Sequence, residues 1–201
     1  LSHLRQTIKY LQQNEYAKES DLLIFSDYPK SQSDIKCVEE VRNFCSNISN
    51  FKSVNTILRH KNFGLAKNLV SGISEVLKKN DKVIVLEDDL VTDKFFLKYI
   101  NDALIKYKNN YEVISVHGYV YPLKNNQDKT FFLKGADCWG WGTWKRGWNI
   151  YNENSEYLLE NIKRNNLKKE FDFNNNFNFF KMLKKTVKDK NSSWAIKWYA
   201  S

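Results

Sequence analysis

The sequence of 201 residues has no apolar run that is long enough to span a membrane. Its three cysteines, Cys37, Cys45 and Cys138, are too few and too scattered for a disulfide framework or a zinc site. Arginine-rich arms, zinc-finger spacings and the signature of an RNA-binding sheet are also missing. The sequence therefore does not fit the membrane-spanning, disulfide-rich or zinc-finger classes. Its cysteine usage favours a reducing, cytoplasmic compartment.

Apolar and basic residues are abundant. Hydrophobic residues make up 42% and aromatic residues 15% of the chain, which is enough for one domain, residues 1–201, with a core. The net charge of +9 suits nucleic acid, an anionic membrane surface or an acidic small substrate. Because no nucleic-acid-binding motif accompanies the lysines, we do not expect nucleic acid as a partner. A peripheral contact with the anionic inner face of a membrane stays open.

Helical periodicity and short apolar runs alternate along the chain. The expected helices cover residues 1–13, 34–47, 65–79, 95–104, 157–168 and 179–188. The expected strands cover residues 22–25, 54–58, 83–86, 113–116 and 131–133. Thr92 is expected to cap the helix that follows it, and the aromatic segment 194–199 is expected to dock on the domain. This alternation predicts an α/β fold with a mainly parallel sheet flanked by helices.

Three carboxylates, Glu87, Asp88 and Asp89, follow the apolar run that begins at Val83. An unpaired charge inside a strand that is covered on both faces would be expensive. If Asp88 and Asp89 lie just past the strand, they occupy the edge at which open α/β sheets bind ligands. Their oxygens suit Mg²⁺ or Mn²⁺, and such an ion would hold a diphosphate. The alternative is an acidic strand end that caps the next helix.

Two further strands end in polar residues. Asp27 follows the 22–25 strand, and Arg59 follows the 54–58 strand. Gly64, a little further on, suggests the start of a helix or a close approach of the backbone to a ligand. The three strand ends would meet at one crevice, although Asp27 is also explained as a turn former.

Four tryptophans and four glycines alternate within residues 135–148. Glycines let the backbone approach a ligand, and indole rings offer flat apolar faces that suit a sugar ring. The alternative is a core cluster of large aromatic side chains. The density of glycine favours a ligand-facing loop.

The segment Val85–Leu90, followed by a Phe-Phe helix, resembles the acidic metal-binding motif of GT-A glycosyltransferases, especially in the N-acetylglucosaminyltransferase I group. Residues 59–68 resemble the segment that precedes this motif in glycosyltransferase family 2 enzymes. Residues 135–148 resemble the acceptor-side loop of related bacterial sugar transferases. The resemblance spans the whole chain. It implies a GT-A (Rossmann-like) fold, with a nucleotide-sugar half at about residues 1–92 and an acceptor half at about 93–201.

The resemblance implies a role for each site residue. Asp89 would ligate Mn²⁺ or Mg²⁺ on the donor diphosphate, and Trp139 and Trp141 would contact the acceptor sugar. Asp27 would lie near the nucleotide base. Asp88 and Glu87 would contact the ribose or the donor sugar, or orient the site. The residues implied to bind the nucleotide sugar are Asp27, Arg59, Asn62, Glu87 and Asp88.

The implied activity is transfer of a hexosyl or N-acetylhexosaminyl group in bacterial surface polysaccharide synthesis. The donor would be a nucleotide sugar, above all a UDP-sugar, and the acceptor a glycan or a lipid-linked glycan. An inverting displacement needs a base for the acceptor hydroxyl. The related group carries that base in a Trp-Asp-Asp-Trp segment, whereas Trp194–Trp198 contains no carboxylate here. Asp137 is the substitute candidate, and a turn residue is its alternative role.

The start of the chain also departs from the family pattern, because an apolar first strand is missing before the first helix. We therefore expect the sequence to be a fragment of a longer protein. Two other functions stay open: a non-catalytic glycosyltransferase-like assembly domain, and a basic module that binds single-stranded nucleic acid through stacking aromatics and lysines.

Overall fold

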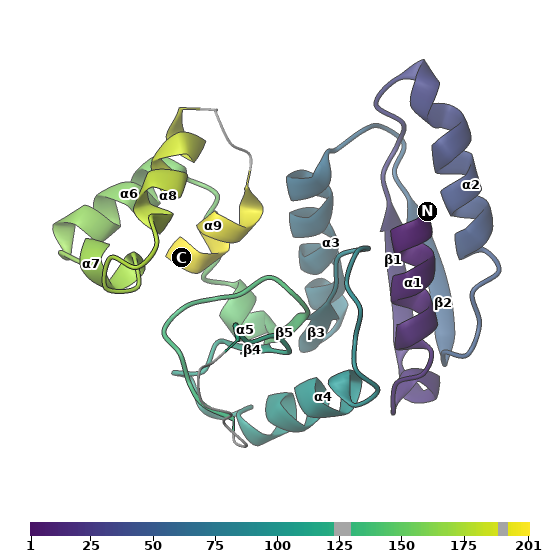
Figure 1. Ribbon diagram of the computed structural model, residues 1–201, viewed down its shortest axis with the longest axis horizontal. Coiled ribbons are helices and arrows are strands. Elements are labelled where there is room, and N and C mark those ends of the chain that lie inside the picture. The colour runs from purple at the N-terminus through teal and green to yellow at the C-terminus, as the bar shows by residue number, and fades with distance from the viewer. Residues whose placement is uncertain (123–129, 189–192) are drawn as a thin grey trace.

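A computed structural model describes residues 1–122, 130–188 and 193–201, which form a mixed α/β structure (Figure 1). Strands β1 (Asp21–Ser26) and β2 (Ser53–Leu58) pair in parallel. Strands β3 (Lys82–Val85), β4 (Ser115–His117) and β5 (Trp141–Trp144) form an antiparallel sheet with β5 in the centre. The described residues thus form two small sheets rather than the single, mainly parallel sheet that the sequence predicts.

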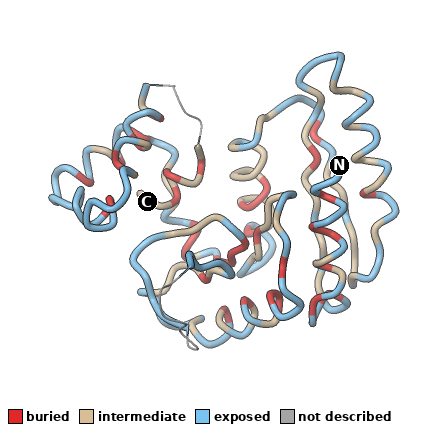
Figure 2. The backbone as a smooth tube through the Cα atoms, viewed as in Figure 1, coloured by how far each residue is buried: buried red, intermediate tan, exposed pale blue. Residues whose placement is uncertain are grey.

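The described α-helices are α1 (Ser2–Leu11), α2 (Ile35–Cys45), α3 (Leu65–Lys79), α4 (Phe96–Lys106), α5 (Lys145–Trp148), α6 (Ser155–Arg164), α7 (Lys168–Phe171), α8 (Phe179–Val187) and α9 (Trp194–Ala200). Six of the described helices lie close to the positions expected from apolar periodicity, whereas α5, α7 and α9 are helices that the sequence did not predict. Their buried residues fall on inward faces, as the red segments of Figure 2 show. Within the described part of the chain, no helix is both long and apolar enough to cross a membrane.

Helices cover both faces of the β1–β2 pair. Leu22 and Ile24 point toward α1 and α2, where they pack with Cys45. Phe25 points to the opposite face, because successive side chains of a strand alternate. There its ring lies against Gly72 of α3, and a Cβ at Gly72 would come within 3.1 Å of the ring. Helix α3 also contacts β3, so it joins the two sheets along one side.

The same alternation explains the core around β5. Trp144 faces α4, where it packs in one cluster with Ile100 and Leu104. Trp141 faces the other side and packs against Trp148 of α5 and the tryptophans of α9. The segment that the sequence predicts as a ligand-facing loop is therefore, from Trp141 onward, a core strand followed by the short helix α5. The alternative of an aromatic core describes this part correctly.

Helices α6, α7 and α8 form a separate cluster at the C-terminal end of the fold (Figure 1). Helix α9 joins this cluster to the sheet, because Ile196 packs into it while Trp194 and Trp198 pack beside β5. The prediction that segment 194–199 docks on the domain is confirmed. The strand predicted at residues 131–133 is wrong, since these residues form no strand and their side chains are exposed.

Candidate functional site

The acidic segment Glu87–Asp89 begins two residues beyond the last residue of β3, Val85. Asp88 and Asp89 are exposed, and Glu87 is half-buried. Thr7 of α1 donates a 3.0 Å hydrogen bond from Oγ1 to the backbone carbonyl of Asp88. The carboxylates therefore lie past the strand end, as predicted, and α1 fixes their backbone.

The surroundings of Glu87 disfavour its charged form. Burial raises the pKa of its carboxyl group, and the negative charges of Asp89 and Asp88 raise it further. A hydrogen bond from the side chain of Trp194 acts in the opposite direction. A cation bound beside Glu87 would offset the unfavourable effect of the two aspartates on its charged form.

The loop from Gly135 to Gly140 is held by two hydrogen bonds around Asp137. Its Oδ1 accepts the backbone N–H of Trp139 at 2.8 Å, and its own N–H donates to Nδ1 of His117 at 3.2 Å. Burial lowers the pKa of His117, which favours the neutral ring. Because Nδ1 accepts a hydrogen bond, Nε2 carries the proton and donates to Oγ of Ser115 at 2.8 Å. His117 thus positions the loop.

Cys138 connects this loop to the acidic segment. Its side chain packs in the cluster that contains Val85. Burial raises the pKa of the thiol to about 12, and the charges of Asp137, Glu87 and Asp89 act in the same direction. The structure therefore brings together, in one electrostatic environment, three residues that the sequence proposes for the site.

An exposed aromatic group lies where this loop meets the segment that follows β4. It consists of Tyr119, Tyr121 and Trp139, whose side chains are 39%, 58% and 45% exposed. The ring centroids of Trp139 lie 4.9 Å from Tyr119 and 6.0 Å from Tyr121. The sequence patterns did not single out the two tyrosines, which follow a predicted strand and are separated by one residue. Trp141, which was predicted beside Trp139 as an acceptor contact, is 0% exposed and presents no face to a ligand in this structure.

Asp27 ties two loops together. Its Oδ1 accepts the backbone N–H groups of Tyr28 and Phe63, and its Oδ2 accepts that of Gly64, all at 2.8 Å. Asn62 donates from Nδ2 to the carbonyl of Tyr28 at 2.6 Å. Gly64 has a φ of 72° and immediately precedes α3, so it serves as the start of a helix. These contacts give Asp27 and Asn62 structural roles; contact with a nucleotide stays a prediction.

Arg59 is turned toward α3. Its guanidinium donates from Nε, Nη2 and Nη1 to Asn68, Ser71 and Glu75 at 2.8, 2.9 and 2.8 Å. The rings of Phe25 and Phe63 flank it, with centroids 5.0 and 4.9 Å from Cζ. The side chain is only 9% exposed, so most of its donor capacity is used inside the protein.

A metal site made entirely of protein ligands is not present in the described residues, because no three histidine, cysteine or acidic side chains converge. The exposed carboxylates of Asp88 and Asp89 nevertheless suit an ion that takes its other ligands from water and a diphosphate. Mg²⁺ is commonly bound in this way, through one or two carboxylates.

Comparison of the chain with protein-family models, with curated proteins and with solved structures finds no match. A function has to be argued from the residues themselves.

Proposed function

We propose that the chain is a metal-dependent GT-A glycosyltransferase domain. It would transfer a hexosyl or N-acetylhexosaminyl group from a nucleotide sugar, above all a UDP-sugar, to a glycan or lipid-linked acceptor. The observation that carries this proposal is that Cys138, on the loop that bears Asp137 and Trp139, packs in the same cluster as Val85, the last residue of β3 before the acidic segment. Its three free cysteines fit a reducing, cytoplasmic compartment.

The donor side of the proposed site is the acidic segment. Asp89, with Asp88 beside it, would hold Mn²⁺ or Mg²⁺, and Glu87 would orient the donor. The ion neutralises the diphosphate as it leaves. Burial and the charges of Asp89 and Asp88 raise the pKa of Glu87, and a cation at the segment would offset the part that comes from the two aspartates.

The acceptor side is the loop 135–140 with its aromatic group. Asp137 uses Oδ1 for the turn, and no hydrogen bond to Oδ2 occurs within residues 1–122, 130–188 and 193–201. That oxygen would take the proton of the acceptor hydroxyl in an inverting displacement. Trp139, Tyr119 and Tyr121 would stack on the apolar faces of the acceptor sugar.

The arrangement of the two sheets is compatible with a single GT-A sheet. In the described chain, β1 pairs only with β2 and β3 only with β5, while α3 contacts both β1 and β3. A further strand between β1 and β3 would join the two sheets into one mixed sheet that helices flank.

The test is a thermal-shift titration with UDP, GDP and CDP, each with and without Mn²⁺. A ligand that binds only the folded state raises the melting temperature. We expect a metal-dependent shift with one nucleotide, lost in Asp89→Asn and kept in Asp81→Asn, whose side chain lies at the other end of β3 and is exposed. Shifts that are equal in the two variants would contradict the donor site.

A non-catalytic assembly domain is the second candidate, because Trp194–Trp198 has no carboxylate and Asp27 and Arg59 are used internally. Donor hydrolysis or transfer in the parent protein, abolished in Asp137→Asn while the nucleotide shift is unchanged, would support the enzyme. A nucleotide shift without turnover of any sugar donor would support the assembly domain.

A further inference from the structure

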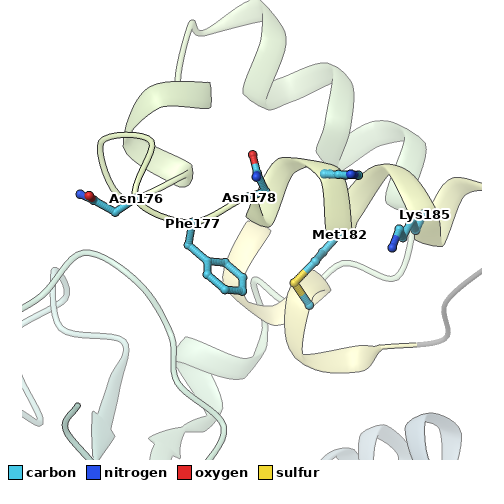
Figure 3. A pocket seen from close by; sticks show the side chains of 6 residues that line it. Asn176, Phe177, Asn178, Met182 and Lys185 are labelled. Atoms are coloured by element: carbon cyan, nitrogen blue, oxygen red, sulfur yellow. The ribbon is translucent and has the colours of Figure 1, made fainter. Parts of the chain in front are cut away.

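A hollow of about 340 Å³ lies between residues 176–178 and the exposed side of α8. Figure 3 shows that Phe177 and Met182 project to the same side of this helix. Amides and ammonium groups complete the lining, which consists of Asn176, Phe177, Asn178, Lys181, Met182 and Lys185. The hollow belongs to the cluster of α6–α8 and shares no residue with the proposed transferase site.

The wall of the hollow is fixed by a buried carboxylate. Asp172 is 2% exposed, and its Oδ1 accepts the backbone N–H of Phe180, in the first turn of α8, at 2.7 Å. The backbone carbonyl of Asp172 accepts the N–H of Phe177 at 3.1 Å. These bonds set the position at which the chain enters α8. The backbone of Phe177, which lines the hollow, is therefore fixed relative to α8.

The charge around the hollow is strongly positive. Residues 163–188 contain eight basic and two acidic residues. Lys168 pairs with Asp172 at 3.2 Å, and Lys134 pairs with Glu170 at 2.6 Å, so both acids are already neutralised. The lysines of the hollow form no ion pair with any described residue.

Lys181 and Lys185 lie one helical turn apart on the same exposed face of α8. Like charges at this spacing destabilise a helix by roughly 0.2–0.5 kcal/mol. An anion between them would remove that repulsion and form charge-assisted hydrogen bonds with both ammonium groups. The spacing therefore favours a compact anion such as a phosphate.

The apolar side chains of the lining favour a ligand that has an apolar part as well as a negative charge. Phe177 is 53% exposed and lines the same hollow as the two lysines. Met182 is half-buried, and its flexible thioether adapts to irregular apolar groups. A ligand that covers both side chains and also bears a phosphate is an alkyl phosphate.

We propose that this hollow binds the phosphate head and the adjoining alkyl chain of an anionic lipid or another alkyl phosphate. Lys181 and Lys185 contact the phosphate, and Phe177 and Met182 contact the alkyl chain. This proposal is independent of the transferase activity, because it uses none of the residues assigned to the donor or acceptor.

The test uses the fact that Met182 is the only methionine of the chain. Protein labelled with ¹³C at the methionine methyl gives one resonance, which reports directly on the hollow. We expect hexyl phosphate to shift this resonance at lower concentration than inorganic phosphate or hexanol. Lys181→Gln combined with Lys185→Gln should weaken hexyl phosphate binding about tenfold or more, because two charge-assisted contacts are lost. Lys78→Gln with Lys79→Gln, on α3, is the control with the same loss of charge.

A second experiment distinguishes between a lipid in a bilayer and a soluble alkyl phosphate as the ligand. Co-sedimentation is measured with vesicles of phosphatidylcholine, with and without phosphatidic acid. Phe177→Ser should lose the binding that phosphatidic acid adds, whereas Phe132→Ser, at an exposed site away from α8, should keep it. Binding of hexyl phosphate without binding to vesicles would assign the site to soluble alkyl phosphates. Three outcomes would overturn the proposal: an equal loss in the α3 control, no effect of Phe177→Ser on hexyl phosphate binding, or a response to inorganic phosphate as strong as to hexyl phosphate.

Discussion

Oγ1 of Thr7 donates a hydrogen bond to the backbone carbonyl of Asp88, so the first helix holds the acidic segment from a distance of 81 residues in sequence. The bond joins the hydroxyl of Thr7, a residue that is 4% exposed, to the backbone next to Asp89, the proposed metal ligand. It therefore couples the stability of α1 to the geometry of the donor site.

Thr7→Val removes this bond and keeps the shape of the side chain. We expect a loss of about 0.5–1.5 kcal/mol in the free energy of unfolding, measured by urea denaturation. Thr130→Val is the matched control, because Thr130 is exposed. Equal losses in the two variants would show that the bond contributes nothing specific.

Gly142→Ala should destabilise the sheet. An added Cβ would lie 2.6 Å from Cγ2 of Ile100 and 3.0 Å from Cδ1 of Leu104, and both side chains are buried. Overpacking of this kind costs about 1–3 kcal/mol. In a double-mutant cycle with Ile100→Ala, the combined loss should be smaller than the sum of the single losses. Additive losses would contradict a direct clash with Ile100.

His117 should make stability depend on pH in mildly acidic solution. Burial lowers its pKa below the ordinary value of 6.5, so the unfolded state binds the proton more readily. The stabilisation is complete above pH 6.5 and decreases as the pH falls toward the lowered pKa. Urea denaturation from pH 7.5 to pH 5 should show a smaller loss in His117→Asn than in the parent. The variant of an exposed histidine, His60→Asn, should behave like the parent.

Glu87→Gln should stabilise the protein at neutral pH. Its pKa is raised above 4.5, so its favourable contribution is complete below pH 4.5 and is lost as the pH rises through the raised pKa. The variant should therefore melt at a higher temperature than the parent at pH 7, and the two should converge near pH 4. The control variant Glu112→Gln, at an exposed site, should melt at the same temperature as the parent at both pH 7 and pH 4. If the acidic segment binds Mn²⁺, the ion should narrow the difference at pH 7.

The three cysteines should react with maleimide at different rates. Cys37 is exposed and Cys45 is buried, while the pKa of Cys138 is raised to about 12. Because the thiolate is the reactive form, Cys37 should be labelled first at pH 8 and Cys138 should lag well behind it. Peptide mass spectrometry measures both rates in one sample. Labelling of Cys138 as fast as Cys37 would show that its thiol is not shielded by burial and negative charge.

Local patterns predict much of the fold. The apolar stripe between Leu65 and Lys79 has the bounds of α3, and the carboxylates after Val85 lie past the end of β3 as expected. Contacts between distant segments were not predictable in this way. Thr92 does not cap α4; it accepts a hydrogen bond from Asn14, whose Oδ1 accepts the N–H of Leu97 in the first turn. The helix cap comes from a residue 83 positions away in the sequence.

In the candidate site, too, local sequence patterns were predictable and contacts between distant segments were not. The order of residues indicates that Glu87 and Asp89 follow a strand, but not that Cys138 brings the 135–140 loop beside them. Composition also leaves two roles open for each tryptophan. Trp141 is part of the core because β5 points its ring at Trp148 of α5 and at Trp194 and Trp198 of α9, whereas Trp139, two residues earlier, lies outside the strand.

The burial of the tryptophans gives the chain an intrinsic optical probe. Five of the six indoles are at most 7% exposed, and only Trp139 is open to solvent, at the proposed acceptor surface. A soluble quencher such as acrylamide will therefore reduce the fluorescence of Trp139 while the buried indoles keep theirs. A saccharide that stacks on Trp139 will protect it from the quencher, so contact at this surface can be followed without a label and without knowing the donor.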